Sequence, residues 1–379
     1  MNLAGHYTRG LGFFEQYKAS NFPTWFVPCN NDTCTGARFI RRKWLDNHFI
    51  GTIWALNYNS RRSQITLGGS LNQYLGDHFT ELVWQREINF PNEPGYRYDL
   101  GEGDKSDANV FAKIQQGFSP HLHGFLDLQL RRVDYEMSLQ KLVEPNGWQE
   151  ETWHGDYLFF NPKAGILHDL SKTATLYASF AVAQKEPNRD DFTESPTGAL
   201  PKPERLFNTE AGFRANGRRA AFSANVYHMA YKDQLVLTGN INDVGAPVRR
   251  NVPDSYRLGM ELAGNLALAQ GLSFEGNATF SRNKIKNFTE YVDNWDTGTQ
   301  AVFQRGTTDI SFSPSFIAFG KLGYAFENLF GKENQRLEFA LSGKHVGSQF
   351  MDNTSNEHTK LDAYTVSDFQ IQWTMKPLV

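Results

Sequence analysis

The chain has 379 residues, of which 40% are hydrophobic, 14% aromatic and 21% charged, and its formal net charge is −3. That charge is too small to indicate nucleic acid or an acidic partner. The sequence contains no run of 18 apolar residues, which excludes a helical membrane protein. Many aromatic residues together with a mean hydropathy of −0.52 are typical of a membrane β-sheet that has lipid on one face and water on the other.

Alternation of apolar and polar residues predicts an all-β chain of about fourteen strands. The strands are expected near residues 2–9, 43–58, 63–75, 107–118, 121–135, 157–169, 172–185, 204–215, 218–233, 255–268, 272–285, 313–326, 336–349 and 362–374. Tight connections carry turn residues at 59–62, 119–120, 169–171, 215–217 and 270–271. Long connections alternate with them and cover about 10–42, 76–106, 136–156, 186–203, 234–254, 286–312 and 350–361.

The segment Phe125 to Arg131 (FLDLQLR) shows the strand pattern most clearly. Because side chains of a strand alternate between its faces, Leu126, Leu128 and Leu130 point one way and the intervening polar residues the other. Asp127, Arg131, Glu275 and Asn277 are accordingly predicted to face water. Similar alternation recurs at 65–72, 274–281 and 368–373.

Short and long connections in strict succession predict a transmembrane antiparallel β-barrel, with its short turns on the periplasmic side and its long loops facing outward. Aromatic residues gather near the strand ends, for example Trp44, Tyr157, Tyr256 and Tyr324. Rings with one polar edge favour the headgroup level and form girdles around barrels. The alternative is the ordinary aromatic core of a soluble β protein.

Two cysteines, Cys29 and Cys34, lie in the polar segment CNNDTC. A disulfide between them is expected in an oxidising compartment. A zinc site would need four ligands, and no second cysteine pair is present.

Aromatic side chains mixed with Arg, Asp and Asn occupy the long connections. Exposed rings beside polar groups are suited to trapping a bulky ligand, although packing between loops is an equally good explanation. The candidate ligand-binding residues are Trp25, Phe26, Trp84, Tyr96, Tyr98, Trp148, Trp153 and Trp295.

The sequence offers little for catalysis or for a bound metal or cofactor. His121 and His123 flank a tight turn without a third ligand nearby, which favours a solvated turn. The acidic stretch DLGEGDKSD (99–107) lacks the ligand spacing of an EF-hand. No Ser, His and Asp grouping has the surroundings of a nucleophile. We therefore expect no enzyme, no metal site and no cofactor.

Several stretches resemble TonB-dependent outer-membrane receptors, in particular those of Bacteroides-type bacteria. The most specific is the stretch around Lys202-Pro203-Glu204, followed by a strand that reads TEAGF (209–213). The others are HYTRGLGFFEQYK (6–18), RRKWLDNHFIG (41–51), FFNPKAGI (159–166), FAVAQKEPNRDDF (180–192), YKDQLVLTGNINDVG (231–245), NVPDSYRLGMEL (251–262) and SRNKIKNFTEYV (281–292).

The resemblance covers the barrel portion of the family and implies a 22-stranded wall with a plugged lumen. A plug, a signal peptide and the last two strands have no counterpart in the sequence, so the 379 residues are expected to be a fragment truncated at both ends. Its fourteen strands would correspond to roughly the seventh through twentieth strands of the barrel.

The resemblance implies an active transporter in the outer membrane of a Gram-negative, Bacteroidetes-like bacterium. Its ligand would be a siderophore-iron complex, haem, cobalamin or a similar large molecule, and its partners would be membrane lipid and, through the plug, TonB. A passive porin and a hydrolase with its active site at the barrel rim are the alternatives. The gene sequence upstream of Met1 would distinguish a passive porin from an active transporter, because a porin needs no plug.

Overall fold

The computed structural model of the protein describes residues 1–19, 38–86, 94–143, 147–193, 195, 200–241, 247–294, 299–327 and 335–375. The first strands are β1 (Asn2–Ala19), β2 (Arg38–Asn59), β3 (Ser63–Gln85), β4 (Arg97–Gly117), β5 (Leu122–Val143), β6 (Gly147–Ser171) and β7 (Ala174–Lys185). They are followed by α1 (Arg189–Thr193), β8 (Glu204–Asn216), β9 (Ala220–Ile241), β10 (Pro247–Ala269), β11 (Leu272–Asn294) and β12 (Thr299–Asp309). The last elements are β13 (Phe316–Glu327), β14 (Gln335–Val346), β15 (Gln349–Phe350), η2 (Glu357–Thr359), β16 (Lys360–Leu361) and β17 (Tyr364–Met375).

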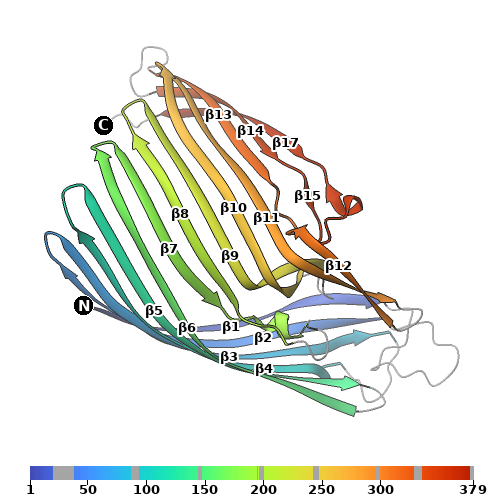
Figure 1. The fold of residues 1–379 in the computed structure, drawn as a ribbon. Helices are drawn as coiled ribbons and strands as arrows, with labels where there is room; N and C mark the ends of the chain where they lie inside the picture. Colours follow the sequence, from blue (N-terminus) through green and yellow to red (C-terminus); the bar gives the residue numbers. More distant parts are fainter. Residues whose placement is uncertain are drawn as a thin grey trace. The chain divides into compact units, whose positions relative to one another are not determined.

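The strands pair in the order in which they occur in the chain (Figure 1). The path runs from β1 to β11 and continues through β13 and β14 to β17, which makes fourteen strands. The sequence-based count of fourteen is therefore confirmed for this path. β12 is an additional strand that pairs with β11 beside the path, and β15 and β16 form a separate two-stranded sheet. Consecutive antiparallel pairing is the topology of an up-and-down wall.

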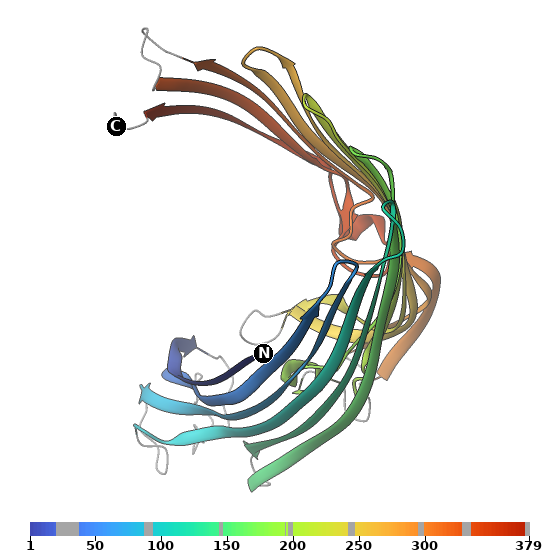
Figure 2. The same cartoon turned by 90° about the vertical axis from the view of Figure 1, so that its left-hand side faces the viewer.

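The chain divides into two compact units. Unit 1 comprises Met1–Asn59, Ile65–Lys113 and Gln129–Phe160, and unit 2 comprises Ser60–Gln64, Ile114–Leu128 and Asn161–Val379. Unit 2 holds the strands from β7 to β17, and Figure 2 shows that this part of the sheet, coloured from green to red, is curved.

Short turns join neighbouring strands at one end of unit 2, as the sequence predicts. The turn between β10 and β11 contains Gly271 with a φ of +78°, a conformation that glycine adopts readily. A Cβ atom there would stand 2.3 Å from the carbonyl oxygen of Ala325. We call this the short-turn end, and the opposite end of the strands the long-loop end.

The sheet of unit 2 has one apolar and one polar face. Residues directly opposite each other in an antiparallel sheet share a face. One row across β8, β9, β10, β11 and β13 reads Ala211, Val226, Met260, Phe280 and Phe316. Val226, Met260 and Phe280 are exposed to 51%, 39% and 46%, although they are apolar. We call this the outer face, and the opposite one the polar face.

Many strands are longer than a membrane requires. A tilted transmembrane strand needs about 9–11 residues, whereas β3, β10 and β11 each have 23. The predicted boundaries were consequently wrong at the long-loop end: β1 reaches Ala19 and β6 begins at Gly147, within segments expected to be loops. In these segments the alternation that reveals a strand disappears, while the backbone pairing continues, as between Ala19 and Arg38.

Unit 1 has a small apolar cluster of its own. Phe39, Leu82 and Tyr98 are buried together, and Tyr96 packs against them. Polar side chains also link its strands: the Arg131 guanidinium donates to both carboxylate oxygens of Asp107 at 2.6–3.2 Å. This bidentate pair joins β5 to β4.

Unit 2 has a second apolar cluster towards the long-loop end. Val236, Val252, Ile285 and Ile310 are each no more than 4% exposed, and Phe288 packs against them. The helices in the described ranges include none long and apolar enough to cross a membrane.

Candidate functional site

The polar face of unit 2 presents rows of hydrogen-bonding and charged side chains. One row across seven strands reads Asn216, Ala221, Asn265, Glu275, Lys321, Ser342 and Asp368. Two rows farther along the same face, the Tyr177 hydroxyl donates to Asn225 Oδ1 at 3.1 Å, and Asn225 Nδ2 donates to Glu261 Oε2 at 3.4 Å. Such a surface suits contact with water or with a polar partner.

The segment after β7 is fixed to this face by an ion pair. The carboxylate of Asp191 in α1 is only 3% exposed and accepts hydrogen bonds from Arg249 of β10 at 3.0 and 2.7 Å. Asn188 and Asp191 also bond each other reciprocally, each side chain accepting from the other's backbone N–H at 2.8–2.9 Å. This arrangement starts the short helix and orients the carboxylate towards Arg249.

Asn251 of β10 extends the same attachment. Its Oδ1 accepts from the N–H of Lys202 at 2.8 Å, and its Nδ2 donates to the carbonyls of Lys202 and Asp233 at 2.9 and 2.7 Å. Glu204 accepts from the N–H of Leu235 at 3.1 Å. Asp233 has a φ of +51°, which is an irregular backbone conformation within β9. The hydrogen bond from Asn251 to the Asp233 carbonyl stabilises this conformation.

Four of the stretches that carry the family resemblance meet at this point. They contain Asp191, Glu204, Asp233 and Asn251. We call Asp191, Lys202, Glu204, Arg249 and Asn251 the anchor cluster. Its side chains form hydrogen bonds with backbone groups and with one another. The family resemblance at this point is therefore explained by the attachment of a long segment to the sheet.

The segments 309–315 and 349–361 form a second attachment in unit 2. Asn353 is 3% exposed; its Nδ2 donates to the carbonyl of Leu237 at 2.5 Å and its Oδ1 accepts from the N–H of Ser311 at 2.8 Å. The Ser311 hydroxyl also donates to Leu237 O at 3.0 Å. Sequence reasoning missed Asn353, because a single Asn in a polar stretch gives no pattern.

The predicted ligand-binding aromatics of unit 1 differ in their surroundings. Trp84 and Trp148 are 45% and 46% exposed, and Trp153 is half-buried. Tyr98 is 1% exposed, inside the apolar cluster, and Tyr96 lies against it. The exposed tryptophans have the accessibility that ligand capture needs, whereas the ring of Tyr98 packs the strands together.

Trp25, Phe26, Trp295 and the predicted disulfide partners Cys29 and Cys34 lie outside the described residues. Their roles stay predictions. Of the residues expected to face water, Glu275 and Asn277 occupy the polar face of β11, and Arg131 pairs with Asp107.

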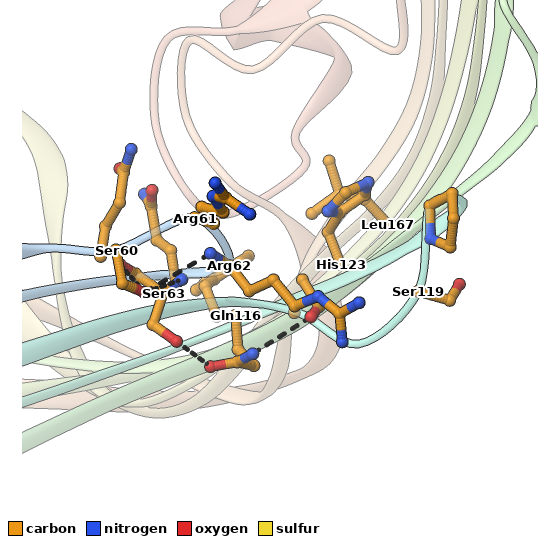
Figure 3. A pocket seen from close by; sticks show the side chains of 14 residues that line it. Ser60, Arg61, Arg62, Ser63, Gln116, Ser119, His123 and Leu167 are labelled. Atoms are coloured by element: carbon orange, nitrogen blue, oxygen red, sulfur yellow. Dashed lines mark hydrogen bonds between the residues drawn. The ribbon is translucent and has the colours of Figure 1, made fainter.

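A cleft of about 610 Å³ lies at the short-turn end of unit 2 (Figure 3). Arg61 and Arg62 line it from the turn between β2 and β3, and the Ser63 hydroxyl donates to Gln116 Oε1 at 2.6 Å. His123 also lines it and places Nε2 3.4 Å from Asp169 Oδ2. Within the described ranges no group of three His, Cys, Asp or Glu side chains could hold a metal ion.

An up-and-down antiparallel wall with an apolar outer face, a polar opposite face and strands long enough to span a bilayer defines a transmembrane β-barrel protein. The sequence matches the family described as "TonB dependent receptor-like, beta-barrel" over residues 2–377. The chain therefore belongs to this family, whose members are receptors of the outer membrane of Gram-negative bacteria. A search among curated proteins found no match.

Solved structures show the same fold. The ferric yersiniabactin uptake receptor FyuA from Yersinia pestis is 14% identical with a TM-score of 0.62, over 98% of this chain and 52% of that one. The copper transporter OprC is 12% identical with a TM-score of 0.68, over 97% and 53%. The ferric preacinetobactin receptor BauA from Acinetobacter baumannii is 10% identical with a TM-score of 0.62, over 99% and 54%. The chain spans about half the length of these structures.

Proposed function

We propose that the protein takes up a scarce, large ligand across the outer membrane, with energy supplied through TonB. The ligand class is a siderophore-iron complex, haem, cobalamin or a similar metal complex. The family match over residues 2–377 is the observation that carries the proposal. Solved structures of similar fold include receptors for ferric siderophores and a copper transporter, which supports the ligand class.

The wall is proposed to belong to a 22-stranded barrel, because a lumen of that size holds a plug through which TonB can act. The polar face would then face the lumen. Its rows contain both charges, such as Glu275 beside Lys321, and would either hold the plug or line the passage that opens when the plug rearranges. The outer face would contact membrane lipid. The source would be a Bacteroidetes-like bacterium, because the sequence motifs resemble those of receptors from Bacteroides-type bacteria.

Ligand capture is assigned to the long-loop end. The strands of unit 1 continue well beyond the length of a membrane span, and Trp84 and Trp148 are exposed there. Flat aromatic surfaces desolvate readily against a bulky ligand, and nearby polar groups fix its orientation. Trp153 of unit 1 is proposed to contribute to the same surface. Trp25, Phe26 and Trp295 lie outside the described residues and stay candidate ligand-binding residues.

Uptake assays in intact cells test this function. Cells that carry the full-length gene, and cells that lack it, are given a panel of radiolabelled ferric siderophores, haem and cobalamin at nanomolar concentration. We expect accumulation of one ligand class that stops in a strain without TonB or after a protonophore is added. Uptake that is unaffected by loss of TonB would instead identify a passive porin.

Substitution of Trp84 and Trp148 by Ala then tests the capture surface. We expect weaker ligand binding by the purified receptor while the amount of folded protein stays constant. A matched control is Trp44→Phe, because Trp44 Nε1 donates to Glu81 at 2.8 Å within the wall and is not assigned to ligand. Equal loss in both variants would contradict the assignment.

A further inference from the structure

The outer face of unit 2 changes from apolar to cationic towards the long-loop end. The change occurs over three rows that cross β8, β9, β10 and β11. From the apolar side outward the rows read Thr209, His228, Leu258 and Arg282; Phe207, Ala230, Tyr256 and Lys284; and Arg205, Lys232, Asp254 and Lys286. Residues opposite one another in a sheet point to the same face, so these cations share their face with Val226, Met260 and Phe280.

The charges in these rows are only partly balanced. Lys232 forms an ion pair with Asp254, and Lys284 with Asp309 at 2.6 Å. Arg205 donates to the uncharged Gln184 at 3.0 Å. Neither Arg282 nor Lys286 makes an ion pair with any residue that the structure describes. Five cations and two carboxylates leave a net charge of +3. We call Arg205, Lys232, Arg282, Lys284 and Lys286 the basic belt.

Two residues of the basic belt, Lys232 and Lys286, line a cavity on the same face. It has a volume of about 380 Å³ and is lined by His228, Lys232, Tyr256 and Lys286, among others. Lys286 Nζ lies 5.8 Å from the centre of the Tyr256 ring, and the His228 ring lies 6.4 Å from it. Cations held beside an aromatic ring at the edge of an apolar surface are suited to a group that is anionic at one end and apolar at the other.

The height of the basic belt places it at a membrane boundary. His228 and Lys232 follow the turn residue Arg219 by 9 and 13 residues. At about 3.3 Å per residue and a tilt of about 45°, the belt lies about 20–30 Å from the short turns, where an apolar band about 25 Å tall ends. The belt therefore lies at the headgroup level of the outward-facing leaflet.

We propose that the basic belt binds the phosphate groups of an anionic lipid in the outward-facing leaflet, whose acyl chains lie along the apolar rows below. The inference rests on the outer-membrane location that the proposed function requires. The phosphorylated glycolipid of that leaflet has the matching chemistry. Clustered basic side chains next to a membrane-spanning surface attract such headgroups.

Binding of purified full-length protein to diphosphoryl lipid A tests the site. The protein is extracted in a non-ionic detergent, and native mass spectrometry follows the bound lipid during a titration. The test variant combines Arg205→Gln, Arg282→Gln and Lys286→Gln, and we expect its affinity to fall at least tenfold. The matched control combines Lys163→Gln, Arg214→Gln and Lys344→Gln, which are equally exposed cations of the polar face. We expect the control to stay within twofold of the native protein.

Asp254→Asn provides a change in the opposite direction, which guards against loss of folding. Removing the carboxylate frees Lys232, and we expect about threefold tighter binding. Dephosphorylated lipid A should bind at least tenfold more weakly than the diphosphorylated form. Equal affinity of the two lipids, or an unchanged affinity in the triple variant of the basic belt, would overturn the proposal. Inorganic phosphate alone binding as tightly as the lipid would show an ion site and overturn it too.

Lipid binding needs neither TonB nor the transported ligand. A negative uptake assay would therefore refute the transport function and leave the lipid site standing, provided that the purified protein binds lipid as described. Conversely, the two triple variants could bind lipid equally well while the native protein shows TonB-dependent uptake. That result would refute lipid binding by the basic belt and leave the transport function standing.

Discussion

Val226→Arg gives the sharpest test of the two-faced wall. Val226 is 51% exposed on the outer face and follows Arg219 of the short turn by seven residues. At about 3.3 Å per residue and a tilt of about 45°, it lies about 16 Å from the turn, near the middle of an apolar band about 25 Å tall. A guanidinium there must leave water for hydrocarbon, which costs about 2–4 kcal/mol of folding free energy.

Asn225→Arg is the matched control, one residue away on the polar face. It loses the hydrogen bonds to Tyr177 and Glu261, but the new guanidinium lies opposite Glu261 and can pair with it. An exchange of two exposed hydrogen bonds, one of them long, for an exposed ion pair changes stability by no more than about 1 kcal/mol. The same reasoning applies to Leu128→Arg and Gln129→Arg in β5.

Urea titrations of the full-length protein in lipid vesicles, followed by tryptophan fluorescence, provide the free energies of unfolding. We expect Val226→Arg to be less stable than the native protein by about 2–4 kcal/mol and Asn225→Arg to be nearly neutral. Equal losses at the two positions would refute the assignment of the outer face to lipid.

Three further changes probe other parts of the chain. Arg249→Ala leaves the buried Asp191 carboxylate without its guanidinium and should cost about 3–5 kcal/mol in the same titrations, whereas an unchanged midpoint would exclude the anchor cluster as a stabilising element. Asn353→Ala should increase hydrogen exchange in 349–361, because it loses bonds to two segments; unchanged exchange would contradict this role. Thiol reagents should label Cys29 and Cys34 in intact cells only after reduction, and labelling without reductant would show that no disulfide joins them.

The repeating part of the fold could be predicted from the sequence. Strands such as β5 have an apolar and a polar face, so residues like Leu126 and Asp127 alternate and reveal the orientation of the strand. The turn at Gly271 was also predictable, because its backbone conformation favours glycine. The fourteen strands of the main path follow from these two signals.

The long-loop end was not predictable in the same way. The first residues of β6, from Gly147, do not alternate between apolar and polar, and their polar side chains are typical of a loop. Arg249 and Asp191 are 58 positions apart, so nothing local indicates that they pair. The basic belt depends on register across four strands, which places Arg205, Lys232 and Lys286 in one row although each looks like an isolated surface charge in the sequence.

The anchor cluster has a consequence for how such a receptor can evolve. Arg249 and Asn251 hold the segment 186–203 at its base, on the wall itself. Substitutions, insertions and deletions farther along the loops would leave those attachments intact and so would not unfold the strands. Mutations that alter which ligand is recognised can thus accumulate at the tips with little loss of stability, and one barrel framework can serve a lineage of receptors with diverging nutrient preferences.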